Sequence, residues 1–169
     1  AVALTKAFHK MGLADAGIKW PNDILVNGRK LVGILTDMSG SMEEISYIVM
    51  GIGVNVKTKQ EELPEEIKQI ATSLLMEGVD IERTEAFKII LEELEHQYYD
   101  VLDSGFEDTL NEWRKLSVTL NQEIEVRAPG NTYEGVATDI DDDGNLLVKT
   151  TNGEVKRIVA GDVSIRPRK

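Results

Sequence analysis

The sequence of 169 residues predicts an α+β fold in which a mixed, mostly antiparallel sheet with helices precedes a small β-barrel or sandwich. One observation behind this prediction is the dipeptide Asn27-Gly28 between two apolar runs, because this dipeptide strongly favours a tight type I′ hairpin. A second is the change at Ser117 from helical periodicity to short alternating strands separated by turns that contain glycine and asparagine. We therefore expect two domains, residues 1–116 and residues 117–169.

Four segments place apolar residues at helical spacing. Residues 1–11 predict an amphipathic helix that ends at Gly12. Residues 63–78 begin with an early proline and acidic side chains, which predicts a second helix. Residues 84–105 and 106–116 predict a long third helix and a shorter fourth one.

The expected strands are short, apolar and often β-branched. In the first domain they cover residues 14–20, 24–26, 31–35 and 45–56, and Ser39-Gly40-Ser41 should turn the chain into the last of them. The second domain should contain five strands: Glu123–Arg127, Thr132–Ile140, Asn145–Thr150, Val155–Val159 and Val163–Arg166.

Composition limits the classes of protein that fit. Hydrophobic residues make up 41% of the chain and charged residues 29%, and no apolar run approaches the ~18 residues of a membrane span, so we expect a soluble globular protein. The chain has no cysteine, which excludes disulfides, thiolate metal sites and cysteine nucleophiles. That absence fits a reducing compartment, and we expect a cytoplasmic location.

The distribution of charge indicates the kind of ligand. A net charge of −11 argues against a nucleic-acid surface. The excess acid lies in residues 61–112, which carry sixteen acidic and three basic side chains, whereas residues 1–60 carry seven basic and five acidic ones. An anionic small ligand is therefore compatible with the first sixty residues.

The segment Lys19-Trp20-Pro21-Asn22-Asp23 is the strongest candidate for a site. Proline fixes its own φ and holds the preceding residue extended, so Lys19 and Asp23 should stand at a rigid strand end. A cation placed near free backbone amides suits a carboxylate or a phosphate. The alternative is an exposed strand-end lysine, a core tryptophan and a simple Pro-Asn-Asp turn, and spacing alone leaves both interpretations open.

Two further patterns involve glycine and aspartate. Gly51 and Gly53 lie inside a predicted strand, where glycine marks either a bulge or the close approach of a ligand, and Asn55 beside them could read the edge of a heterocycle.

The residues Asp139, Asp141, Asp143 and Gly144 match the first half of a calcium-binding loop. Thr150 occupies the position where such a loop needs a bidentate glutamate, so the sequence favours a solvated hairpin turn.

Three motifs in this order resemble those of the biotin protein ligase family: Lys19–Asp23, Arg29–Leu35 and Gly51–Val56. Gly161–Arg166, after a short β module, resembles the end of the family's C-terminal SH3-like domain. The resemblance implies a catalytic layer similar to class II synthetases in residues 1–116, followed by an SH3-like barrel in residues 117–169.

The resemblance also implies chemistry. Biotin and Mg-ATP would form biotinyl-adenylate, and a lysine of a biotin carboxyl carrier protein domain would then accept the biotinyl group. Lys19 would be the catalytic residue that neutralises the biotin carboxylate and the α-phosphate. The other implied roles are close ligand approach at Gly33, Gly51 and Gly53, adenine contact at Asn55, phosphate contact at Arg166, and magnesium ligation or orientation at Asp23.

The sequence also departs from the family pattern. The family's glycine- and arginine-rich loop and its Ser/Thr-containing biotin segment, both upstream in the family, have no counterpart here. We therefore expect the chain to be the C-terminal part of a catalytic region, to bind no nucleic acid itself, and to adenylate biotin poorly alone. A noncatalytic ligand- or protein-binding module is the alternative function, and edge strands near Asn27-Gly28 could support a homodimer.

Overall fold

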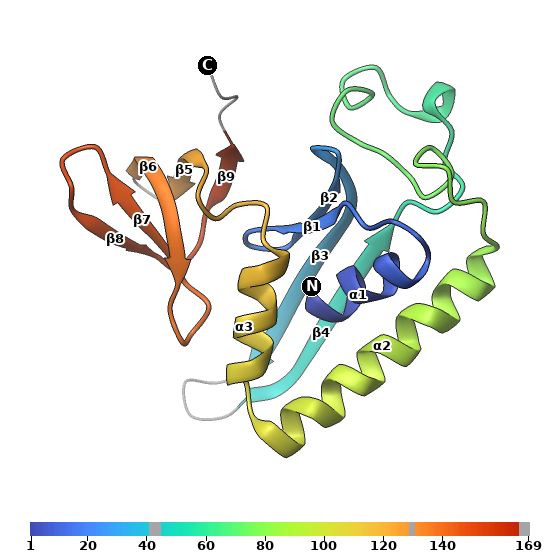
Figure 1. The fold of residues 1–169 in the computed structure, drawn as a ribbon, viewed down its shortest axis with the longest axis horizontal. Coiled ribbons are helices and arrows are strands. Elements are labelled where there is room, and N and C mark those ends of the chain that lie inside the picture. The colour runs from blue at the N-terminus through green and yellow to red at the C-terminus, as the bar shows by residue number, and fades with distance from the viewer. Residues whose placement is uncertain (41–44, 129–130, 166–169) are drawn as a thin grey trace.

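The computed structural model describes residues 1–40, 45–128 and 131–165. Within them the chain forms a four-stranded and a five-stranded antiparallel sheet, with the helices gathered around the first (Figure 1). The α+β prediction is confirmed. No helix of these described ranges is long and apolar enough to cross a membrane.

The first sheet has the strand order β1-β2-β3-β4. Its strands are β1 (Ala16–Lys19), β2 (Asp23–Val26), β3 (Arg29–Gly40) and β4 (Ile45–Val54). The predicted hairpin joins β2 to β3, and Asn27 and Gly28 have φ values of 51° and 76°, as a type I′ turn requires.

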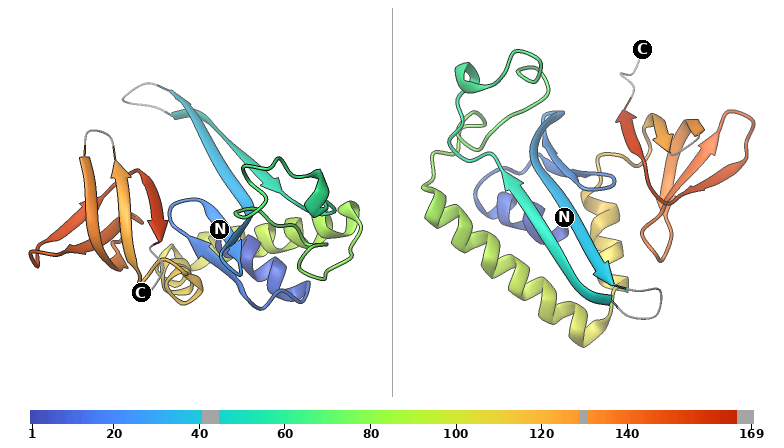
Figure 2. Two further views of the ribbon diagram at one scale, coloured as in Figure 1. Left: turned by 90° about the horizontal axis from the view of Figure 1, so that it is seen from above. Right: turned by 180° about the vertical axis from the view of Figure 1, so that it is seen from behind.

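The hairpin of β3 and β4 extends beyond the other strands (Figure 2). A turn at Ser39-Gly40-Ser41 was expected, but Ser39 and Gly40 still belong to β3 and pair with Tyr47 and Ile45. That part of the prediction is wrong, and Ser41 lies outside the described residues.

Three α-helices accompany the first sheet: α1 (Val2–Lys10), α2 (Arg83–Ser104) and α3 (Glu107–Leu116). They confirm the first, third and fourth predicted helices to within two residues at each end. The α1 helix covers one face of the sheet, and α2 lies against α1 (Figure 1). The buried core between these elements consists of Leu4, Ala7, Phe8, Leu13, Ala16, Ile24, Val26, Leu31, Val32, Ile34, Leu74, Ala86 and Ile90.

The helix predicted over residues 63–78 is wrong. A 3-10 helix, η1 (Gln60–Glu62), is followed by successive turns. The reason is tertiary, because several backbone groups of this segment bond to β3 and to Asn55, so its internal bonds form separate turns and not one helical ladder. Lys30 N–H donates to Ile70 O at 2.7 Å, and Thr72 N–H donates to Lys30 O at 2.9 Å. Leu74 N–H likewise donates to Asn55 O at 2.9 Å, so these groups are not available for a helical ladder.

The second sheet confirms the five predicted short strands. They are β5 (Glu123–Ala128), β6 (Asn131–Ile140), β7 (Leu146–Thr150), β8 (Val155–Ile158) and β9 (Asp162–Ile165), in the order β8-β7-β6-β5-β9. Their core contains Trp20, Ile124, Val126, Ala137, Ile140, Leu146, Val148, Ile158 and Val163. One member of this second core, Trp20, thus comes from the connection between β1 and β2 of the first sheet.

Strand β1 also contacts the connection that leads into the second sheet. Val118 N–H donates to Ile18 O at 2.9 Å, and Ile18 forms a parallel bridge with Ser117. The approach needs glycine at position 17, since a Cβ there would lie 2.3 Å from Val118 Cγ1. The first sheet and the segment that leads into the second sheet therefore meet along β1.

Candidate functional site

An open cavity of about 960 Å³ lies where the first sheet meets β9 of the second. Its volume is within the ~300–1,000 Å³ of typical small-molecule sites. Residues of β1 to β4, of the turn segment 67–71 and of β9 line it. They include Lys19, Asp23, Lys30, Gly33, Gly53, Asn55, Ile70, Val163 and Ser164. Four segments distant in sequence thus converge on one hollow.

A carboxylate between two lysines dominates the electrostatics of the cavity. Asp23 Oδ1 lies 2.6 Å from Lys30 Nζ, and Asp23 Oδ2 lies 3.9 Å from Lys19 Nζ. The side chains of Lys19 and Asp23 are 25% and 16% exposed. Because two ammonium groups face one carboxylate, the cluster retains one net positive charge, which suits an anionic ligand.

Lys30 reaches this cluster because of a β-bulge, and the sequence analysis did not single it out. Asp23 pairs with Gly33 and Ile24 with Val32, but Leu25 then pairs with Lys30, which leaves one extra residue in β3. This slip brings Lys30 onto the face of Asp23 and Leu25. In the sequence, the one indication that Lys30 could join the site is its place in the basic pair Arg29-Lys30, directly after the Asn27-Gly28 turn.

Two paired glycines, Gly33 and Gly53, form part of the cavity surface. A Cβ on Gly33 would lie 3.1 Å from Lys30 Cε, so the missing side chain leaves room for the lysine to reach Asp23. A Cβ on Gly53 would meet only Gly33 O, at an ordinary 3.8 Å. The β3–β4 register is continuous at Gly53, so a bulge does not explain this glycine. Ligand approach at Gly53 stays a prediction.

The three other predicted site residues, Asn55, Gly51 and Arg166, differ in their position relative to the cavity. Asn55 lines the cavity, but its side-chain Nδ2 donates to Thr72 O at 3.0 Å and so also fixes the turn segment. Gly51 pairs with Leu35 further along β4 and is not among the cavity-lining residues. Arg166 lies outside the described residues.

Two residues of the motif, Trp20 and Asn22, anchor it to neighbouring parts of the structure. Trp20 is buried in the second core, and its Nε1 donates to Gly144 O at 3.0 Å. Trp20 N–H donates to Thr119 Oγ1 at 2.9 Å. Asn22 Nδ2 donates to Ile34 O at 2.7 Å, which fixes the turn to β3. Lys19 and Asp23 are therefore each next to an anchored residue, because Lys19 precedes Trp20 and Asp23 follows Asn22.

A metal site was predicted only at Asp23. Within the described ranges, no group of three or more His, Asp or Glu side chains could hold a metal ion. Asp23 is the one carboxylate among the cavity-lining residues, and Lys30 already contacts it. Magnesium ligation by Asp23 stays a prediction, and no chemical step is assigned to it.

The acidic turn between β6 and β7 has its own partners. Asp141 accepts hydrogen bonds from the backbone N–H groups of Asp143 and Asn145 and pairs with Arg157. The Arg157 guanidinium lowers the pKa of Asp141 to about 2. The turn has strands on both sides, as the hairpin interpretation expected.

The fold and the cavity together define a class: α+β proteins with a cationic cavity where a helix-covered sheet meets a small second sheet. Two family models match the chain. The model described as "Biotin/lipoate A/B protein ligase family" matches residues 2–55, and "Biotin protein ligase C terminal domain" matches residues 119–166.

Individual relatives agree with these models. The chain is 36% identical over 166 residues to the bifunctional ligase/repressor BirA of Bacillus subtilis, and 35% identical over 152 residues to the biotin--[acetyl-CoA-carboxylase] ligase of Mycobacterium tuberculosis. The alignments cover 98% and 89% of this chain. The chain belongs to the biotin protein ligase family. It spans about half of each relative, 51% and 53%.

Solved structures show the same fold. The apo biotin protein ligase of Aquifex aeolicus superposes with a TM-score of 0.84 at 24% identity, covering 99% of this chain and 72% of that one. The Aquifex aeolicus ligase in complex with biotin and ATP gives a TM-score of 0.80 at 25% identity, with 99% and 68% covered.

Proposed function

We propose that this chain supplies part of a biotin protein ligase active site, in which the cavity between the two domains receives biotin and ATP. The observation that carries the proposal is the cluster of Lys19, Lys30 and Asp23 beside the glycine pair Gly33 and Gly53. Family membership supports it, as does the complex of the Aquifex aeolicus relative with biotin and ATP.

The proposed reaction has two steps. In the first, a carboxylate oxygen of biotin forms a bond to the α-phosphorus of ATP while the bond to the β-phosphate bridge breaks, which releases pyrophosphate and leaves biotinyl-adenylate. In the second, the neutral amine of a carrier-protein lysine attacks the acyl carbon. AMP leaves with the electron pair of the broken C–O bond, and the amine loses its proton.

The lysine pair addresses the main electrostatic difficulty of the first step. Two unit anions about 4 Å apart repel by roughly 4 kcal/mol at an effective dielectric constant of ~20. Lys19, which is the less exposed lysine and is held between Ile18 and Trp20, would lie at the junction of carboxylate and α-phosphate and offset that repulsion. Lys30, which is 48% exposed, would contribute from the rim.

Magnesium would neutralise ATP phosphates when bound, and Asp23 is the candidate protein ligand. Adenine contact by Asn55 and phosphate contact by Arg166 complete the proposal for the nucleotide. Close ligand approach at Gly51 belongs to the same proposal, although this glycine lies beyond the cavity-lining residues.

Calorimetry with biotin, ATP and a nonhydrolysable biotinyl-adenylate analogue tests the proposal. Loss of a charge-assisted contact costs about 1.5–3 kcal/mol, so Lys19→Ala should weaken binding of the analogue by roughly 10- to 100-fold. Lys30→Ala should weaken it less, because this side chain is more exposed. Lys115→Ala is the matched control, since Lys115 lies on α3 and pairs with Glu112.

Two outcomes would contradict the ligase proposal. If biotin, ATP and the analogue all give no heat with the chain, the noncatalytic binding or interaction module is the better interpretation. If Lys19→Ala binds the analogue as well as Lys115→Ala does, Lys19 has no part in ligand binding.

A further inference from the structure

Glu77 carries a nearly buried carboxylate that the proposed function does not use. Its side chain is 7% exposed and forms an ion pair with Arg29, whose Nη2 lies 2.6 Å from Glu77 Oε1. The same carboxylate accepts hydrogen bonds from Asn27 Nδ2 at 3.0 Å and from Thr72 Oγ1 at 2.5 Å. A charge withdrawn from water costs free energy unless its partners compensate, and here three donors surround it.

The partners of Glu77 belong to two segments that both line the ligand cavity. Asn27 and Arg29 lie at the turn between β2 and β3, and Thr72 directly follows the turn segment 67–71. Both segments contribute cavity-lining residues, whereas Glu77 is not among them. Figure 1 shows the loop after β4, in green, beside the end of the sheet that carries the β2–β3 turn. Glu77 therefore joins two parts of the cavity wall without being part of its surface.

Backbone hydrogen bonds connect the same two segments. Lys30 N–H donates to Ile70 O at 2.7 Å, and Thr72 N–H donates to Lys30 O at 2.9 Å. Arg29 immediately precedes Lys30, so the ion pair of Arg29 with Glu77 reinforces this contact from the side chain. The turn segment is thus held against β3 by its backbone and by one carboxylate.

Thr72 also fixes the orientation of the Asn55 amide. Asn55 Nδ2 donates to Thr72 O at 3.0 Å. A carbonyl oxygen only accepts, so the amide nitrogen must face Thr72 and the amide oxygen must face another direction. Asn55 Oδ1 accepts no hydrogen bond from the described residues, and none of their buried side-chain oxygens lacks a partner. This oxygen is therefore accessible, on a residue that lines the cavity.

Resting on the proposed function, and in particular on adenine contact by Asn55, we propose that Glu77 is a positioning residue that determines which nucleotide base the cavity accepts. Glu77 holds Thr72, and Thr72 O holds the Asn55 amide with its oxygen free for the ligand. An amide oxygen accepts a hydrogen bond from an exocyclic amine, whereas a carbonyl oxygen at the same place would leave two acceptors facing each other. The cavity should therefore favour a 6-amino purine over a 6-oxo purine.

Calorimetry with ATP and inosine triphosphate tests the inference, because the two nucleotides share the ribose and the triphosphate and differ in the base. The wild-type chain should bind ATP about tenfold more tightly, which is the contribution of one hydrogen bond. Glu77→Ala releases Thr72 and the Asn55 amide, so this ratio should fall to about two. Glu77→Gln should keep most of the ratio, because its amide oxygen accepts from Arg29 and Thr72 and the exposed Asn27 can turn its own amide.

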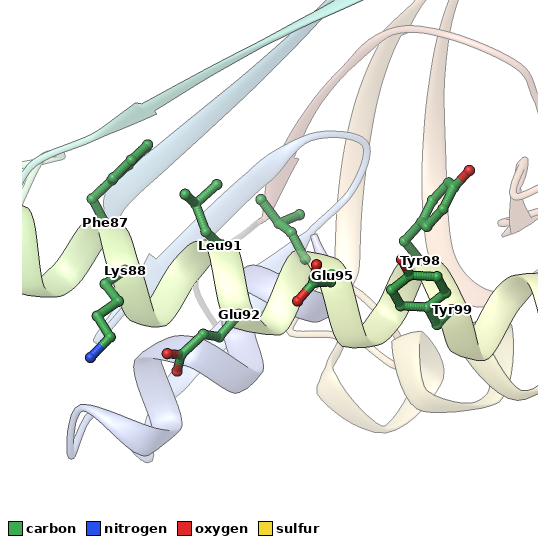
Figure 3. Close-up of a pocket in the computed structure, with 8 residues that line it drawn as sticks. Phe87, Lys88, Leu91, Glu92, Glu95, Tyr98 and Tyr99 are labelled. Atoms are coloured by element: carbon green, nitrogen blue, oxygen red, sulfur yellow. The ribbon is translucent and has the colours of Figure 1, made fainter.

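Glu93→Ala is the matched control. The Glu93 side chain is also 7% exposed and also pairs with a basic residue, Lys10. It lies on α2, which carries a hollow of its own (Figure 3) and contributes none of the cavity-lining residues. This variant should unfold at lower urea concentration but keep the wild-type ratio. Circular dichroism checks that each variant folds, and Thr72→Val, which removes only the hydroxyl that bonds Glu77, should lower the ratio if Glu77→Ala does not fold.

Three results would overturn the inference: a wild-type ratio near one, the wild-type ratio in both Glu77→Ala and Thr72→Val, or an equal fall of the ratio in Glu93→Ala. Lys19→Ala should weaken both nucleotides alike and leave the ratio unchanged. Any of the three results together with weaker binding in Lys19→Ala would overturn this inference alone. If the wild-type chain gives no heat with biotin, ATP or the adenylate analogue, the proposed function fails and this inference fails with it.

Discussion

Replacing Trp20 by alanine should destabilise the second domain and also damage the ligand site. The side chain is 4% exposed, lies among the second-domain core residues, and donates through Nε1 to Gly144 O at 3.0 Å. Truncating a buried tryptophan to alanine costs about 3–5 kcal/mol. Because a domain is stable by only ~5–15 kcal/mol, the change would remove much of its stability.

The functional effect follows from the position of Lys19, one residue before Trp20. Without the indole, the strand end would be tied to the second domain chiefly by the bond from Trp20 N–H to Thr119 Oγ1 and by the bond from Val118 to Ile18. A displacement of about 1 Å at a positioned group can cost up to ~100-fold in rate. We expect affinity for the adenylate analogue to fall about as much as in Lys19→Ala.

The chain supplies a matched control and an optical probe. Trp20 and Trp113 are its two tryptophans, and Trp113 packs against the second core from α3. In urea, tryptophan fluorescence of Trp20→Ala reports the second core through Trp113, while far-ultraviolet circular dichroism follows the helices. Trp113→Ala should lower stability without a comparable loss of affinity. Equal affinities in the two variants, measured where both are folded, would refute the coupling of Trp20 to the site.

Two other predictions concern single positions. Gly53→Ala should keep the free energy of unfolding or raise it by about 0.4–1 kcal/mol, because the strand accepts a Cβ at this position. The same change should weaken binding of the adenylate analogue severalfold. Unchanged affinity in calorimetry would exclude ligand approach at Gly53. The stabilisation from the lowered pKa of Asp141 is complete above its unfolded value of 3.8 and is lost as pH falls to about 2. The urea midpoint of Asp141→Asn should therefore differ from wild type more at about pH 5 than at about pH 2, and a constant difference would contradict this reasoning.

Local patterns predicted much of the fold. Asn27-Gly28 encodes its hairpin because both residues adopt positive φ, and this preference is local. The segments that form α2 and α3 likewise predict their own helices, because their apolar residues recur at helical spacing. Residues 63–78 have a helical start signal too, but their N–H and C=O groups bond to Lys30, Asn55 and Val56, partners that the sequence does not identify.

The site was partly predictable for the same reason. The sequence of the Lys19–Asp23 motif is compatible with two interpretations, and the structure supports elements of both. Trp20 is indeed a core aromatic, although of the other domain, while Lys19 and Asp23 line a cavity. The contribution of Lys30 depends on the bulge in β3, because a regular register would turn this side chain to the opposite face of the sheet.

The predicted domain boundary near residue 116 divides the sequence, but packing crosses it. Trp20 completes the core of the second domain, and Gly17 admits Val118 against β1. A cut after Leu116 would therefore leave an indole exposed on one piece and an unfilled core on the other. The tryptophan of the motif thus joins the strand end that carries Lys19 directly to the core of the second sheet, whose strand β9 lines the same cavity.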